Sequence, residues 1–149
     1  DILRSLLDEA IATAANKQSN DNDSRQPSDP LSYFPPAMAF HSFTGVSEHV
    51  TRILELETAL YDHMKVPTEE RRPICYFGFS HLINFIMCSS EKSARKGRDA
   101  IRAIPLDRIL VESDVPTSED MRLGTAGSIA FIASVREMSL DHVAKITAV

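Results

Sequence analysis

The stretch Arg108-Ile109-Leu110-Val111-Glu112-Ser113-Asp114-Val115-Pro116 decides the fold of this chain. Its consecutive apolar residues predict a buried strand of the kind found in parallel sheets that are covered on both faces. Because side chains alternate along a strand, we expect Leu110, Glu112 and Asp114 to share one face. Burial of two carboxylates on this face is unfavourable unless a cation neutralises their charge. Active sites of parallel α/β folds lie at this end of the strands, so the two acids are candidate site residues. The alternative is that they form salt bridges that only stabilise the end of the strand.

Two further strands are expected before this stretch, at 37–43 and 73–80, because both segments are short, apolar and bounded by proline or turn residues. Apolar residues at helical spacing occupy the other segments, namely Val46 to just before Pro67, 90–103, 125–138 and the residues after Ser139. Strands that alternate with helices predict an α/β fold with a parallel sheet built of β-α-β units.

The faces of the two earlier strands can also be predicted. Alternation places His41 and Phe43 on the same face of the first strand. In the second strand, Phe77 and Phe79 share a face that suits packing against helices, and Gly78 on the other face leaves space for a neighbouring group. A single histidine at a strand end is in most proteins a hydrogen-bonded rim residue, so His41 carries little weight by itself.

The residues before the first strand have a different character. Apolar residues in 1–15 follow the spacing of an amphipathic helix. Residues 16–36 are rich in Asn, Ser, Asp, Gln and Pro, and we expect them to form a polar insertion loop at the surface. We expect residues 1–149 to form one partial domain, with this loop as a tolerated insertion.

Composition narrows the functional classes. The chain has 149 residues and a formal net charge of -5, so it lacks the broad positive charge of a general nucleic-acid-binding protein. Cys75 and Cys88 form no C-x-x-C motif, which predicts neither a disulfide framework nor a structural zinc site. An intracellular location, cytoplasmic or nuclear, is therefore expected. No apolar run approaches the ~20 residues of a membrane helix, so no membrane partner is expected, and the sequence does not indicate a protein partner.

Four short motifs occur at the expected strands. They are His41-Ser42-Phe43-Thr44-Gly45, Tyr76-Phe77-Gly78-Phe79-Ser80, Ala103-Ile104-Pro105-Leu106-Asp107-Arg108-Ile109-Leu110 and Leu110-Val111-Glu112-Ser113-Asp114-Val115-Pro116. In order and spacing they resemble the TatD-like metal-dependent deoxyribonucleases, whose corresponding motifs are H-[CS]-F-T-G, an intervening strand with a glycine and a small residue, A-I-P-x-D-R-L-L and L-x-E-T-D-A-P. The resemblance covers Ala37 to about Val149.

The resemblance implies a (β/α)8 TIM-type barrel that uses divalent metal ions, Mg, Mn or Zn, to hydrolyse phosphodiesters, with DNA as the substrate. Carried over to this sequence, His41 and Asp114 would be metal ligands. Asp114 would also be catalytic, orienting or deprotonating the attacking water. Glu112 would be a supporting group beside them. These residue types suit the chemistry, because imidazole and carboxylate bind such ions and the ions activate water near neutral pH.

Other elements of the family pattern have no counterpart. The family's H-x-H pair, a glutamate and a further histidine on its first four strands are not found, so the chain corresponds to the C-terminal part of the barrel, incomplete in this chain. We therefore expect a metal-dependent hydrolase of ester bonds in the full-length protein, and no activity from this fragment alone. Two alternatives remain open: a non-catalytic barrel scaffold acting as an interaction protein, and an amidohydrolase-type enzyme for a small cyclic amide or lactone.

Overall fold

The computed structural model describes residues 37–88 and 90–147. In chain order, its elements are β1 (Met38–Phe40), α2 (Ser47–His63), the 3₁₀-helix η2 (Thr68–Glu70), β2 (Cys75–Ser80), the π-helix η3 (His81–Met87), α3 (Glu91–Ala103), the 3₁₀-helix η4 (Leu106–Arg108), β3 (Ile109–Glu112), α4 (Met121–Arg136) and α5 (Leu140–Thr147). The helix expected at 1–15 and the insertion expected at 16–36 lie outside the described residues, so the single domain over 1–149 stays a prediction.

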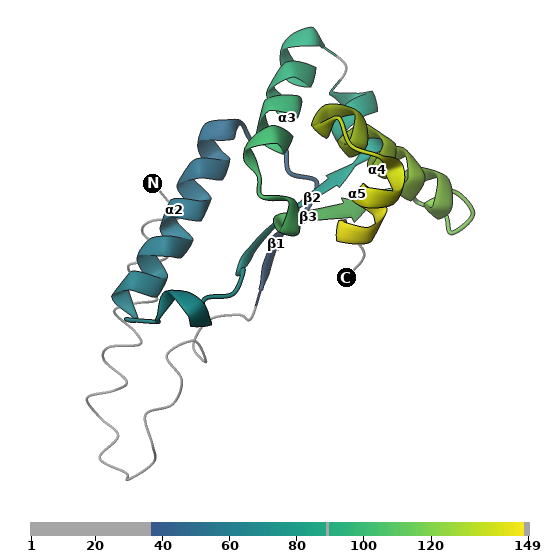
Figure 1. Cartoon of the computed structure of the whole chain (residues 1–149). Coiled ribbons are helices and arrows are strands. Elements are labelled where there is room, and N and C mark those ends of the chain that lie inside the picture. The colour runs from purple at the N-terminus through teal and green to yellow at the C-terminus, as the bar shows by residue number, and fades with distance from the viewer. Residues whose placement is uncertain (1–36, 89, 148–149) are drawn as a thin grey trace.

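The three strands form one parallel sheet in the order β1-β2-β3 (Figure 1). Met38 pairs with Cys75 and Ser80 pairs with Glu112, so the carboxyl ends of the strands meet at one edge of the sheet. The predicted α/β fold with parallel strands is confirmed, and it is consistent with part of a TIM-type barrel. Each strand is shorter than expected, which leaves His41 and Asp114 beyond the last paired residues.

Helices cover the aromatic face of the sheet. Phe77 and Phe79 are fully buried there, and the ring of Phe40 stacks on that of Phe77 with centroids 5.5 Å apart. Removal of this apolar surface from water is the main force that holds the helices on the sheet. The helices add the buried residues Val50, Ile53, Leu60, Ile101, Ile132, Val135 and Val143 to the same core.

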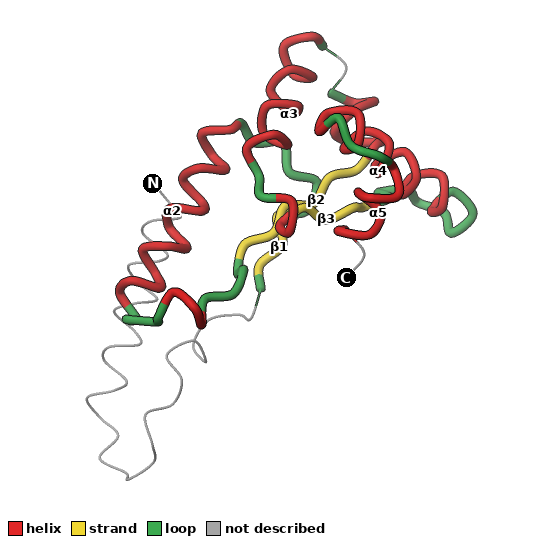
Figure 2. Tube along the Cα trace, viewed as in Figure 1, coloured by secondary structure: helices red, strands yellow, loops and turns green. Residues whose placement is uncertain are grey.

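The helices pack next to one another in chain order. Contacts join α2 to α3, α3 to α4, and α4 to α5, and Figure 2 shows the short strands at the centre with the helices beside them. Helix α3 is amphipathic as expected, because Ala100 and Ile101 are buried whereas Lys92 and Arg95 are exposed. None of the helices in the described part of the chain has the length and hydrophobicity that a membrane span requires.

A buried ion pair connects α2 to the starts of β2 and β3. The Glu57 Oε2 atom accepts hydrogen bonds from the backbone N–H groups of Ile74 (3.0 Å) and Cys75 (2.7 Å) and from Arg108 Nη1 (2.8 Å). Burial raises the pKa of Glu57, but the hydrogen bonds from Arg108 and the two amides outweigh burial and leave that pKa below its ordinary value. Burial, together with the nearby Glu57 carboxylate, raises the pKa of the Cys75 thiol to about 12.

The ion pair between Glu57 and Arg108 should make the stability of the fold depend on pH. Because the folded-state pKa of Glu57 is lowered, its contribution to the free energy of unfolding is present above the unfolded pKa of about 4.3 and is lost as pH falls through the folded value. Glu57→Gln should remove this dependence and cost about 3 kcal/mol at pH 7, because it removes the buried counter-charge of Arg108 and leaves only the exposed Asp107 carboxylate, 3.8 Å away, to balance it. Urea unfolding at several pH values measures both effects. The exposed Glu55→Gln on the same helix is the control, and equal unfolding curves for the two variants would contradict the prediction.

Candidate metal centre

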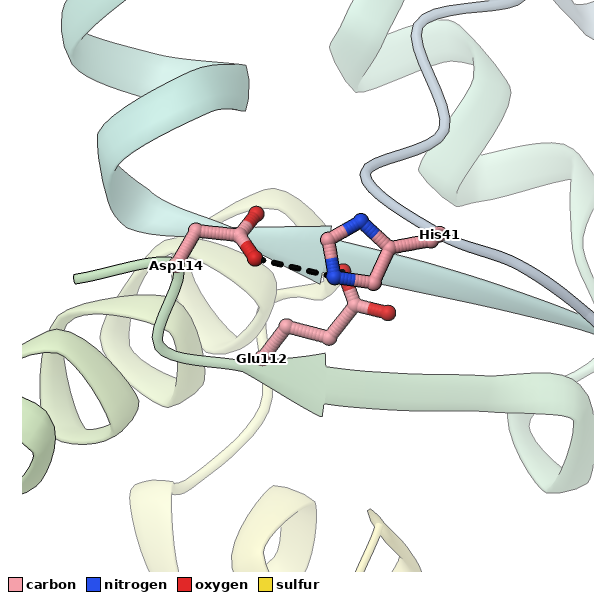
Figure 3. A group of neighbouring side chains, drawn as sticks. All are labelled: His41, Glu112 and Asp114. Carbon is pink, nitrogen blue, oxygen red and sulfur yellow. Dashed lines mark ion pairs between the residues drawn. The ribbon is translucent and has the colours of Figure 1, made fainter. Parts of the chain in front are cut away.

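Three polar side chains meet at the carboxyl edge of the sheet (Figure 3). His41 Nε2 lies 3.1 Å from Asp114 Oδ1 and 3.8 Å from Glu112 Oε2. One potential ligand atom from each residue lies within 4.8 Å of the other two. The structure thus brings together all three of the residues that the sequence singled out, although His41 follows β1 and the two acids lie at the end of β3, on the other side of the central strand.

Two residues with left-handed backbone conformation shape this edge. Ser42 has φ 45° and Asp114 has φ 47°, a region that residues other than glycine rarely adopt. Since β3 ends at Glu112, the expectation that Asp114 follows the strand alternation is wrong. Asp114 reaches the site because the chain turns after the strand and directs its carboxylate back toward His41.

A similar turn corrects the expected position of Phe43. Alternation placed it on the face of His41, but β1 ends at Phe40 and the chain turns through Ser42. The ring of Phe43 therefore returns to the aromatic core, with its centroid 5.0 Å from that of Phe77 in an edge-on contact. This contact anchors the segment after His41 to the core.

Ser42 is a site residue that the sequence analysis did not single out. Its backbone N–H donates to Glu112 Oε2 at 2.8 Å, and its hydroxyl donates to Asp114 Oδ2. Ser42, in the turn that follows β1, thereby forms hydrogen bonds with both carboxylates. The signal lay in the motif around His41, because the resembled family motif H-[CS]-F-T-G has serine or cysteine, both able to donate a hydrogen bond, at the position of Ser42.

Gly78 provides the space in which the Glu112 carboxylate lies. A Cβ atom at Gly78 would lie 1.9 Å from Glu112 Oε1. The expectation that Gly78 leaves space on this face of the sheet is confirmed, and the group that fills the space is Glu112. Gly78 has no positive φ, so the glycine is not needed for an unusual backbone conformation. It is needed because the Glu112 side chain lies where a Cβ atom would be.

The electrostatics of the cluster favour a cation. The side chains of Glu112 and Asp114 are only 16% and 12% exposed, whereas that of His41 is 71% exposed. Among the residues that the structure describes, His41 is the only basic side chain that pairs with either acid. Two largely buried carboxylates and an imidazole form a donor set that suits a divalent ion, so the residues present fit such an ion.

The histidine that follows β2 is not part of this cluster. The ring of His81 stacks on that of Phe85, with centroids 5.1 Å apart, and its backbone N–H donates to Ser128 Oγ at 2.8 Å. His81 begins the π-helix η3. Its side chain lies against Phe85 and helix α4, and it is not in the group of donors formed by His41, Glu112 and Asp114.

A parallel α/β sheet with a histidine and two acids at its carboxyl edge is typical of metal-dependent hydrolases built on TIM-type barrels. A family model described as TatD related DNase matches residues 29–149. The chain belongs to this family of metal-dependent hydrolases, and the resemblance seen in its four motifs is confirmed. No curated protein matches the chain at a significant level.

The contact between Gly78 and Glu112 can be tested directly. Gly78→Ala should displace the Glu112 carboxylate, since the added methyl group would overlap Oε1. The amide hydrogen of Ser42 should then exchange at least about tenfold faster, because a hydrogen bond to a charged acceptor is worth about 1.5–3 kcal/mol. NMR-detected hydrogen exchange at Ser42 measures the effect.

Gly97→Ala in α3 is the matched control, because in the described part of the chain no atom outside the adjacent helix backbone lies within 4 Å of the added Cβ atom. It should stabilise the helix by about 0.5–1 kcal/mol and leave exchange at Ser42 unchanged. Equal protection of Ser42 in the Gly78→Ala variant and in the wild type would show that Glu112 does not depend on this space.

Proposed function

We propose that His41 and Asp114 bind divalent metal ions, with Glu112 as their support, in a hydrolase that cleaves phosphodiester bonds of DNA. The observation that supports this assignment is the approach of His41 Nε2 to Asp114 Oδ1, at 3.1 Å, across a sheet whose central strand separates them. Mg, Mn and Zn are the ions that this donor set suits.

The two carboxylates have different surroundings, which suits different roles. Asp114 directs Oδ1 toward His41 while its Oδ2 accepts the Ser42 hydroxyl. One oxygen atom is thereby held by the protein, and the other faces the centre, where it can hold the proton of an attacking water. A divalent ion in this position supplies charge neutralisation for the phosphodiester and makes water more acidic.

Glu112 is better suited to a supporting role. Its Oε2 atom accepts the Ser42 N–H at 2.8 Å and lies 3.8 Å from His41 Nε2, farther than Asp114 Oδ1. Its carboxylate fixes the turn that carries His41 and adds negative charge beside it. Such outer groups orient metal ligands and increase their basicity.

DNA as the substrate rests on membership of the TatD related DNase family. The net charge of -5 does not favour a broad electrostatic grip on the phosphate backbone. Recognition through ions held by the acids is compatible with this charge, because each ion offers a local positive charge to a phosphate. An intracellular location, where such substrates occur, belongs to the same proposal.

Replacement of either ligand should abolish tight metal binding by this chain. His41→Ala and Asp114→Asn are each expected to weaken Mn²⁺ binding by at least about 100-fold, because even outer-shell partners contribute 10–100-fold. The EPR signal of free Mn²⁺ measures the dissociation constant. His142→Ala, on the exposed side of α5, is the control. Wild-type affinity in the His41→Ala variant would remove His41 from the site.

We further propose that residues 1–149 do not cleave DNA by themselves. The described residues offer three potential donors in one group, fewer than a dinuclear centre requires. Incubation of the 149-residue chain with single-stranded DNA and Mg²⁺, Mn²⁺ or Zn²⁺ should give no metal-dependent product on a denaturing gel. In a longer chain that supplies the remaining donors, turnover should appear and be lost on His41→Ala. Metal-dependent cleavage by the 149-residue chain would contradict the proposed inactivity.

A further inference from the structure

The central strand β2 contributes none of the three clustered side chains, although it lies between the strands whose ends carry them. The separation between His41 and Asp114 therefore depends on how the ends of β1 and β3 are fixed to the end of β2. Two buried polar side chains, Asn84 and Ser128, make these connections.

Asn84 connects the end of β2 to the segment after His41. Its Oδ1 atom accepts the Ser80 N–H at 2.8 Å, and its Nδ2 atom donates to the Phe43 carbonyl at 2.8 Å. The residue is only 4% exposed. It belongs to the π-helix η3, which begins directly after β2.

Ser128 connects the end of β2 to the end of β3. Its Oγ atom accepts the His81 N–H at 2.8 Å and lies 2.7 Å from the Glu112 carbonyl, to which it can donate. The Gly124 carbonyl, at 2.9 Å, is a second acceptor for the same hydroxyl. Ser128 is fully buried, so bulk water does not reach the groups that its hydroxyl binds.

Helix α4 reaches this position because two of its residues are glycines. A Cβ atom at Gly124 would lie 2.9 Å from the Ser113 carbonyl oxygen, and one at Gly127 would lie 2.8 Å from His81 Cγ. The helix backbone can thus approach the ends of both β2 and β3. The short distances from Ser128 to His81 and Glu112 depend on this approach.

We infer that Asn84 and Ser128 are positioning residues of the metal centre, which together set the distance between His41 and the two acids. This inference rests on the proposed function. The physical reason is that buried polar groups are costly to leave unpaired, so both connections have one preferred geometry. Displacement of either strand end would change the separation of the ligand atoms.

The test uses Mn²⁺ binding by the complete 149-residue chain. Ser128→Ala and Asn84→Ala should each weaken Mn²⁺ binding by about 10–100-fold, the range typical of outer-shell partners. The EPR spectrum of the bound Mn²⁺ should also change, because the ligand geometry changes. Ser128→Thr restores a hydroxyl group and should recover most of the affinity. Circular dichroism gives the folded fraction of each variant, and the affinity is corrected for it.

Thr125→Ala is the matched control, since its hydroxyl donates to the Met121 carbonyl within the same helix, at 2.9 Å. It should leave both affinity and spectrum unchanged. Wild-type affinity and an unchanged spectrum for the folded Ser128→Ala and Asn84→Ala proteins would overturn the inference. If His41→Ala still lost Mn²⁺ binding in that case, the proposed function would stand and only the positioning role of Asn84 and Ser128 would fall. If the wild-type chain bound no Mn²⁺, the proposed function and the positioning role would both be overturned.

Discussion

The hydrogen bond from the Ser42 N–H to the Glu112 carboxylate joins the two outer strands of the sheet across the central one. A carboxylate that is only 16% exposed must find partners, because burial of an unpaired charge costs several kcal/mol or more. Gly78 gives it space and the turn after β1 gives it a donor. The positions of His41 and Asp114 follow from this one requirement, since both lie within two residues of the bonded pair.

The two ends of the sheet serve different purposes. At the starts of β2 and β3, the Glu57–Arg108 pair is hydrogen-bonded to backbone N–H groups of the protein and connects strands to a helix. At the opposite edge, the exposed ring of His41 and the two acids place donor atoms within 4.8 Å of one another. The stabilising ion pair and the proposed metal ligands thus lie at opposite ends of the strands, which is also how stability and activity are divided in TIM barrels.

Much of this arrangement could be predicted from the sequence. Apolar runs indicated the three strands, alternation within them indicated the aromatic core face and the space at Gly78, and parallel topology indicated that residues after different strands would meet. The turns could not be predicted, because Ser42 and Asp114 adopt positive φ without the glycine that usually signals it. The role of Ser42 depends on a contact with a residue 70 positions away, and no local pattern reports such a contact. The π-helix η3 was missed for a related reason, since its polar anchor Asn84 bonds to Phe43, a residue of another segment.

The raised pKa of Cys75 gives the chain an experimental advantage. A buried thiol that stays protonated at neutral pH is a poor nucleophile toward alkylating reagents. Cys88, at the end of η3, is only partly buried. A maleimide fluorophore or nitroxide would therefore attach selectively at Cys88 in the unmodified sequence, and would report on movements of the π-helical turn beside the proposed centre.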